Sequence, residues 1–119
     1  MKKPSGPRFS ERAVAHIEDF DARHPDDAPL RLWLQPSLWW GNDDRPEDAI
    51  TYDGPNLCIC GRDGTAGSAT LKNPVTLPVG GCEVVMSPAD YEQTKGIFVD
   101  LLPLSSSSGN TRMFILALI

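Results

Sequence analysis

The hydrophobic pattern of this 119-residue chain changes once, from a helical repeat near the start to short segments typical of β-strands. Between residues 10 and 23, Ala13, Ile17 and Phe20 form one apolar stripe at helical spacing, which Val14 widens. No later segment has that spacing. A chain with one early helix followed by β segments is restricted to an α+β fold, so we predict an N-terminal amphipathic helix packed on a mainly antiparallel or mixed β-sheet.

The ends of the helix are marked in the sequence. Ser10 is a suitable N-cap, because its hydroxyl can accept a hydrogen bond from an otherwise unpaired backbone N–H. Phe9 and Val14 then occupy the two positions of a hydrophobic staple. The helix is expected to stop near Arg23, since Pro25 disfavours helical geometry in the residue before it.

The first strand is predicted at Leu30–Gln35, where three leucines alternate with polar or aromatic residues and Pro36 ends the pattern. Further strands are predicted at residues 49–52, 56–61, 80–88, 97–104 and 112–119. Residues 61–74 have turn composition, with a hairpin as the alternative; 89–96 form a turn or a single helical turn, and 105–110 form a hairpin loop. We expect a flexible arm over residues 1–7 and one α+β domain over residues 8–119.

The last predicted strand contains seven consecutive apolar residues, Met113–Ile119. A run without alternation indicates a strand buried on both faces. Either the strand is central to the sheet, or its outer face pairs with a second copy of the chain. We therefore predict a homodimer.

The charge balance of 16 acidic against 11 basic residues gives a net charge of −5, which repels nucleic acids and anionic lipid surfaces. We expect neither as a partner. The basic residues near the start precede no apolar segment, so they do not resemble a signal peptide, and the longest apolar run is too short to span a bilayer. With three cysteines, an odd number, we expect free thiols and a cytoplasmic location.

Two stretches, FSERAVAHIEDF…APLRLWLQ and GGCEVVMSPADYEQTKGIFVDLL, resemble the A-type iron–sulfur carrier family of HesB/IscA-like proteins. Chains of that family begin with a short strand, a capped amphipathic helix and a strand of the form L-R-L-x-V. Later in these chains a valine-rich strand runs into a Ser-Pro or Asp-Pro turn, a short helical segment and a further strand. The resemblance implies a HesB-like fold.

The residues that bind clusters in that family are absent here. The family places one cysteine in a glycine-rich turn after the L-R-L strand and a C-x-C pair in its tail. In this chain the turn reads Pro-Ser-Leu-Trp-Trp-Gly over residues 36–41, and no cysteine follows Cys82. The resemblance therefore implies a degenerate member that serves as a non-catalytic binding or assembly module with no cofactor and an unidentified protein partner.

The tryptophan pair is the candidate interaction surface. Leu38, Trp39 and Trp40 replace the family's ligand turn with apolar bulk, and indole nitrogen carries no free lone pair for a metal. Two interpretations follow. Either at least one indole caps the core beneath the sheet, or the pair forms an exposed patch for a partner, since tryptophan is enriched among interface anchors.

The three cysteines offer an alternative function. Cys58 and Cys60 would point to the same face of a strand, and Cys82 could approach as a third thiolate of a zinc or iron–sulfur site in cluster biogenesis. No fourth ligand is evident. Core packing is the competing interpretation, because free cysteine behaves as a small buried hydrophobe.

Other chemistry has weaker signals. The glycines at 61, 64 and 67 indicate a β turn, because no helix follows to form a phosphate loop. The acidic residues that follow the tryptophans indicate a solvated loop without the calcium-loop pattern; they are Asp43, Asp44, Glu47 and Asp48. Neither His16 nor His24 pairs with a nucleophile. We predict no enzyme, and a small enzyme of unrecognised type is the third alternative.

Overall fold

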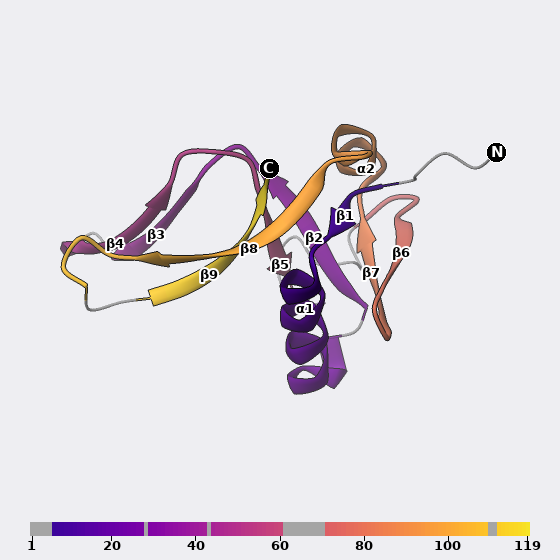
Figure 1. The fold of residues 1–119 in the computed structure, drawn as a ribbon, viewed down its shortest axis with the longest axis horizontal. Helices are drawn as coiled ribbons and strands as arrows, with labels where there is room; N and C mark the ends of the chain where they lie inside the picture. Colours follow the sequence, from indigo (N-terminus) through magenta and orange to yellow (C-terminus); the bar gives the residue numbers. More distant parts are fainter. Residues whose placement is uncertain (1–5, 28, 43, 61–70, 110–111) are drawn as a thin grey trace.

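The structure is a computed structural model that describes residues 6–27, 29–42, 44–60, 71–109 and 112–119 (Figure 1). Its elements in chain order are β1 (Arg8–Phe9), α1 (Glu11–Arg23), the 3₁₀ turn η1 (Pro25–Asp27), β2 (Leu30–Gln35), β3 (Leu38–Asn42), β4 (Arg45–Tyr52), β5 (Asn56–Cys60), β6 (Val75–Val79), β7 (Cys82–Met86), α2 (Pro88–Thr94), β8 (Phe98–Ser105) and β9 (Arg112–Leu118).

Seven of the described strands form one mixed sheet in the order β1-β8-β9-β5-β2-β7-β6. The pairs β1–β8 and β2–β7 are parallel, and the other neighbours are antiparallel. Strands β3 and β4 form a separate two-stranded hairpin. The described chain thus combines two α-helices with mostly β structure, which confirms the α+β prediction at this level.

Helix α1 begins and ends where the sequence predicts. The Ser10 hydroxyl accepts a hydrogen bond from the Ala13 N–H at 3.1 Å, and it also donates to Asp100 Oδ1 at 2.6 Å. The guanidinium of Arg12 donates to both carboxylate oxygens of Asp100 at 2.7 Å. Since Asp100 belongs to β8, the N-cap also anchors the helix to the sheet.

The hydrophobic core lies between α1 and one face of the large sheet. Ala13 and Ile17 are fully buried on the helix. Their neighbours come from six strands and include Leu30, Leu32, Leu57, Val79, Val84, Met86, Val99 and Leu116. The alternation predicted for β2 is confirmed, because Leu30 and Leu32 are buried, Arg31 between them is only partly buried, and Trp33, which follows Leu32, is exposed. One continuous core therefore covers this face.

Two hairpins extend beyond this core (Figure 1). We call residues 38–52 and 102–115 the arm; it contains the β3–β4 hairpin and the outer part of the β8–β9 hairpin, and its residues 43, 110 and 111 lie outside the described chain. The rest is the body. The radius of gyration is 14.6 Å, against about 13.5 Å for a spherical domain of this length. The arm accounts for this elongation.

The local structure differs from the predictions in four places. The turn predicted at residues 36–41 was wrong at its end, where β3 begins at Leu38; the strand predicted at residues 49–52 is present but begins earlier, at Arg45; and β6 was not predicted. Glu47 and Asp48, assigned to an acidic loop, lie within β4. Pairing between β3 and β4 outweighs the weak strand propensity of Asp, Glu and Pro there.

Neighbouring chain segments approach so closely at two positions that only glycine fits there. In β3, a Cβ at Gly41 would lie 2.8 Å from Cβ of Ala49 on the paired strand. Between β6 and β7, Gly80 has a φ of +60°, and a Cβ there would lie 2.7 Å from Val14 Cγ1. The second glycine lets the β6–β7 turn pack directly against α1.

The apolar strand β9 lies inside the sheet, between β8 and β5. Ile115, Leu116 and Ala117 are buried, although they alternate between the two faces. The first of the two explanations for this apolar run, a central strand, is therefore correct. The predicted homodimer stays a prediction.

The chain before α1 is packed where the structure describes it. Gly6 and Pro7, which the sequence analysis assigned to a flexible N-terminal segment over residues 1–7, are buried. The carbonyl of Gly6 accepts a hydrogen bond from the N–H of Gly96 at 3.0 Å. These two residues belong to the packed domain. Among the described helices, none has the length and apolar character that crossing a membrane requires.

Candidate functional site

The β3–β4 hairpin presents its side chains on two faces. Trp40 is paired with Ile50, and Leu38 with Tyr52, so these four residues share one face. Trp39 is paired with Thr51 on the other face. Ile50 is fully buried, so the face that carries it packs inward. The hairpin therefore has an inner face with Trp40 and an outer face with Trp39.

Both indoles of the hairpin are open to solvent. Trp39 is 56% exposed and Trp40 is 53% exposed. Of the two interpretations of the pair, an exposed patch agrees with these values, and neither indole serves as a core cap. Trp33 in the body is 40% exposed, and the guanidinium of Arg31 lies 5.9 Å from its ring centroid.

The end of the hairpin is held by the loop between β8 and β9. The carbonyl of Glu47 accepts hydrogen bonds from the Ser107 hydroxyl at 3.0 Å and from the Ser108 N–H at 3.3 Å. The Ser108 hydroxyl donates to Asp48 Oδ1 at 2.7 Å, and Asp48 also pairs with Arg45 at 3.2 Å. These polar contacts fix the outer end of the arm without covering the tryptophans.

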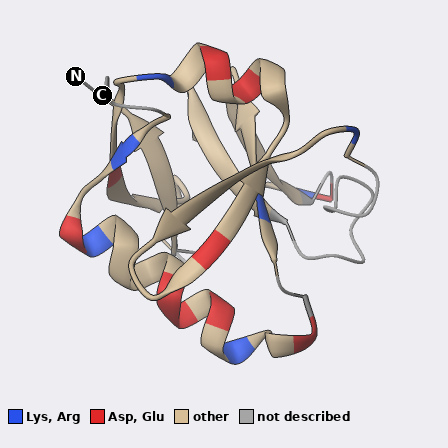
Figure 2. Cartoon of the chain, turned by 90° about the vertical axis from the view of Figure 1, so that its right-hand side faces the viewer, with Lys and Arg blue, Asp and Glu red and all other residues tan. Residues whose placement is uncertain are grey.

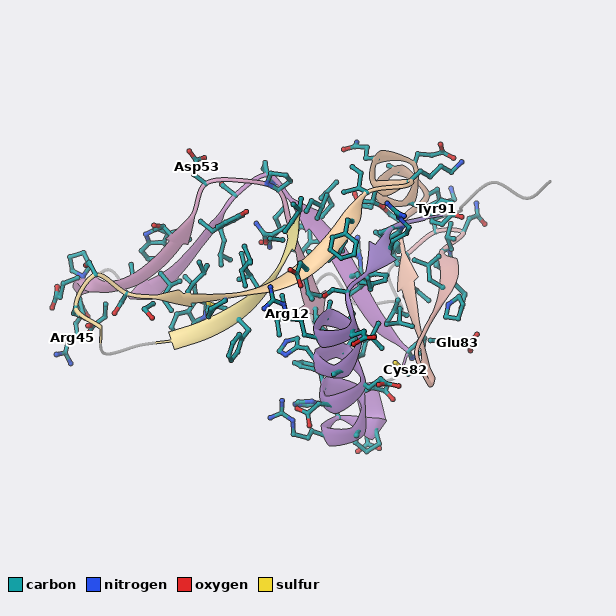
Figure 3. All side chains as sticks on the ribbon, in the orientation of Figure 1. Arg12, Arg45, Asp53, Cys82, Glu83 and Tyr91 are labelled. Carbon is teal, nitrogen blue, oxygen red and sulfur yellow. The ribbon has the colours of Figure 1, made fainter. Side chains whose placement is uncertain are left out.

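The surroundings of the tryptophan pair are acidic. Between positions 43 and 53 the chain carries five carboxylates and one arginine. Figure 3 shows Arg45 at the outer end of the hairpin and Asp53 near the body, where β4 leads into β5. Acidic residues also lie on both helices, as Figure 2 shows. The hairpin is thus an apolar centre with a negative rim.

Strand β3 is an edge. Within the described chain it pairs with β4 alone, and its register is regular from Leu38 to Trp40 before it shifts. The edges of the large sheet are protected differently, because β1 has two residues and β6 carries Pro78, which has no N–H to donate. Strand β3 has neither protection over its regular part.

The predicted thiolate ligands lie in different places. Cys58 is paired with Trp33, and their neighbours Leu57 and Leu32 face the core, so Cys58 lies on the face away from α1. Cys82 packs against the core on the α1 side. The structure therefore does not bring Cys58 and Cys82 together. The side chain of Cys60 lies outside the described residues.

The Cys82 thiol is not activated. Its Sγ donates a hydrogen bond to the carbonyl of Val79 at 3.2 Å. Burial raises the pKa of this thiol, and the charges of Asp21 and Glu18 raise it further, so the protonated form prevails at neutral pH. Figure 3 shows Cys82 beside Glu83 at the start of β7. Within the described chain no three His, Cys, Asp or Glu residues are grouped to hold a metal ion.

The two histidines belong to the helix packing. The ring of His16 lies 6.3 Å from that of Phe114, and burial lowers the pKa of His16. His24 stacks on Phe20, and its Nδ1 lies 2.9 Å from the Phe20 carbonyl oxygen. The three glycines of the predicted turn at 61, 64 and 67 lie outside the described residues.

The sequence analysis missed strand β3 of the arm and the buried acceptor of Gln35 at the end of β2. Strand β3 could have been found from its aromatic pair followed by Gly-Asn-Asp-Asp, a combination typical of a strand that enters a hairpin turn. Gln35 was predicted only as the last residue of the strand Leu30–Gln35, yet its Oε1 is buried without a hydrogen-bond partner. No local signal marks that atom, because the burial of a side-chain atom depends on tertiary packing.

Comparison with known proteins gives no assignment. The chain matches no protein-family model. A search of curated proteins also finds no match.

Proposed function

We propose that this protein is a non-catalytic binding module whose β3–β4 hairpin holds an extended, basic segment of another protein. The observation that carries the proposal is the exposure of Trp39 and Trp40 on opposite faces of one unprotected edge strand. An extended segment that adds to this edge would contact one indole on each side.

The mode of binding follows from the chemistry of a strand edge. Unpaired backbone N–H and C=O groups of an edge strand form hydrogen bonds with an added strand, and alternate side chains of that strand reach the two faces. Large aromatic side chains supply contact area at such a site. The regular register from Leu38 to Trp40 sets where the added strand begins.

The charge of the hairpin selects the partner. Five carboxylates against one arginine between positions 43 and 53 attract a basic segment and repel a second copy of this acidic chain. A pair of identical hairpins would also bring these carboxylates together. We therefore favour a basic partner over self-association at this edge, and any homodimer would use another surface.

The proposed lineage is a HesB/IscA-like domain without cluster ligands. Its support is the order of elements, in which α1 precedes the L-R-L strand β2, and β7, α2 and β8 follow one another as in the second resembling stretch. The turn that holds a ligand cysteine in that family corresponds to the position of β3 here. In this proposal, the hairpin binds a protein segment through its exposed surface, in place of the metal coordination that the family's turn provides.

The thiolate alternative is tested by elemental analysis of protein purified without oxygen. The binding-module proposal predicts less zinc or iron than one atom for every ten chains. Metal in a one-to-one ratio that is lost in a Cys58→Ser variant would favour the alternative instead.

The binding proposal is tested with a short synthetic peptide that alternates lysine and valine. We expect saturable binding by calorimetry that weakens as salt increases. The Trp39→Ala/Trp40→Ala double variant is expected to bind at least about tenfold more weakly, whereas the matched control Trp33→Ala changes the affinity by less than about threefold.

Two further peptides test the charge preference and the backbone hydrogen bonds separately. A peptide that alternates glutamate and valine is expected not to bind, and a lysine–valine peptide with N-methylated backbone nitrogens is expected to bind weakly because it lacks donors. Equal binding of all three peptides, or full affinity in the double variant, would contradict the proposal.

A further inference from the structure

A cavity opens where strands β5 and β9 separate. The two strands are paired at Asn56–Ala117 and Leu57–Leu116. Beyond these pairs, β5 continues beside β2 as far as Cys60, while β9 continues beside β8 as far as Arg112. A cavity of about 170 Å³ occupies the gap between the diverging strands.

The walls of the cavity come from both faces of the sheet. From the α1 side they include His16, Phe20 and Phe114, and from the opposite side Gln35 and Cys58. Most of the exposed wall is carbon, and no Lys, Arg, Asp or Glu occurs among the described residues that line it. An uncharged molecule therefore fits this cavity better than an ion.

Gln35, one of the residues that line the cavity, carries a hydrogen-bond acceptor that lacks a donor. The Oε1 atom of Gln35 is buried and has no hydrogen-bond partner. A buried acceptor without a donor is unfavourable, so a ligand that supplies an O–H or N–H gains affinity there. The nearby amide of Asn56 is already engaged, since its Nδ2 donates to the Gly54 carbonyl at 3.0 Å.

The size and shape of the cavity indicate a single ring. An apolar cavity of about 150 Å³ in another protein binds benzene, which is close to the volume here. The rings of Phe20 and Phe114 offer surfaces for stacking or edge-on contact with an aromatic ligand. Burial lowers the pKa of His16, which favours the uncharged imidazole in this wall.

We propose that the cavity between β5 and β9 binds a small uncharged aromatic molecule bearing one hydroxyl or N–H group, of the phenol or indole type, and that the Gln35 amide turns its Oε1 toward the cavity to accept a hydrogen bond from that group. The site is distinct from the tryptophans of the hairpin. It therefore goes beyond the proposed protein-binding function and does not depend on it.

The test compares phenol with toluene, which has a similar shape but no donor. Titration of the full ¹⁵N-labelled chain with phenol is expected to give saturable shifts at His16, Gln35, Cys58 and Phe114. The Gln35→Met variant keeps the side-chain volume and removes the acceptor. We expect it to lower the ratio of phenol affinity to toluene affinity by about fivefold.

Two variants serve as controls. Cys58→Phe fills the cavity and is expected to abolish binding of both probes, while Trp39→Ala is expected to leave both affinities unchanged. If Cys58→Phe does not fold, the Gln35→Met ratio decides alone. Shifts that do not saturate, shifts confined to the hairpin tryptophans, or an unchanged affinity ratio in Gln35→Met would overturn the proposal.

Discussion

The body and the arm of this molecule are built by different means. In the body, α1 covers one sheet face, and residues such as Ile17 and Leu32 have no exposed surface. In the arm, the outer end is fixed by hydrogen bonds from Ser107 and Ser108, and two indoles stay more than half exposed. The comparison teaches that apolar burial is concentrated in the body, while the arm keeps large apolar side chains in contact with solvent; the proposed function uses that exposed surface.

The largest expected effect is a loss of stability in a core variant of the body that a surface variant of the arm does not share. Ile17→Ala removes a fully buried side chain from the centre of the core, so we expect the free energy of unfolding to fall by about 3 kcal/mol. Trp39→Ala removes a larger but exposed side chain of the arm and is expected to cost less than about 1 kcal/mol. Urea denaturation of both variants measures this difference. Equal losses would show that the arm contributes to the core.

A second prediction concerns the junction of helix and sheet. Ser10→Ala removes the N-cap of α1 and the hydrogen bond to Asp100, and we expect a loss of about 1 kcal/mol in the free energy of unfolding. Ser107→Ala in the arm is the matched control, because its hydroxyl also donates one hydrogen bond. The control is expected to cost less than about half as much. A larger cost for Ser107→Ala would contradict the division into body and arm.

The smallest effect depends on pH. Hydrogen bonds from Arg12 and then from Ser10 hold the pKa of Asp100 well below its usual value of 3.8. A lowered carboxylate pKa contributes stability that is fully present above that usual value and is lost as the pH falls through the folded-state pKa. Asp100→Asn is therefore expected to destabilise the protein at neutral pH, with a difference from wild type that shrinks below about pH 4. A constant difference across this range would exclude the ionic contribution.

Helix α1 and strand β2 of the body could be predicted from the sequence because their signals are local, whereas β6 was missed. The helix between Ser10 and Arg23 is set by its cap, its apolar stripe and the following proline. The alternation of Leu30, Leu32 and Leu34 likewise fixes the face of β2 without knowledge of its neighbours. Periodicity and capping operate within one or two turns of chain, so the sequence displays them.

The arm could not be predicted in the same way because its order comes from pairing. β4 contains Pro46, Glu47 and Asp48, which disfavour strands, and its register with β3, the buried side chain of Ile50 and the contacts from Ser107 and Ser108 hold it. The buried state of Gln35 Oε1 likewise depends on tertiary packing that no local pattern records. The tryptophan pair was identified as a candidate surface, but its exposure on both faces follows from a hairpin that the sequence analysis missed.

The central claim is that β3, and no other strand edge, receives a partner segment. Its most direct test is titration of the full ¹⁵N-labelled chain with the lysine–valine peptide, followed by chemical-shift mapping. We predict saturable shifts at Leu38, Trp39 and Trp40 together with new protection of β3 amides from hydrogen exchange. Shifts at β1 or β6 with β3 unchanged would contradict the claim.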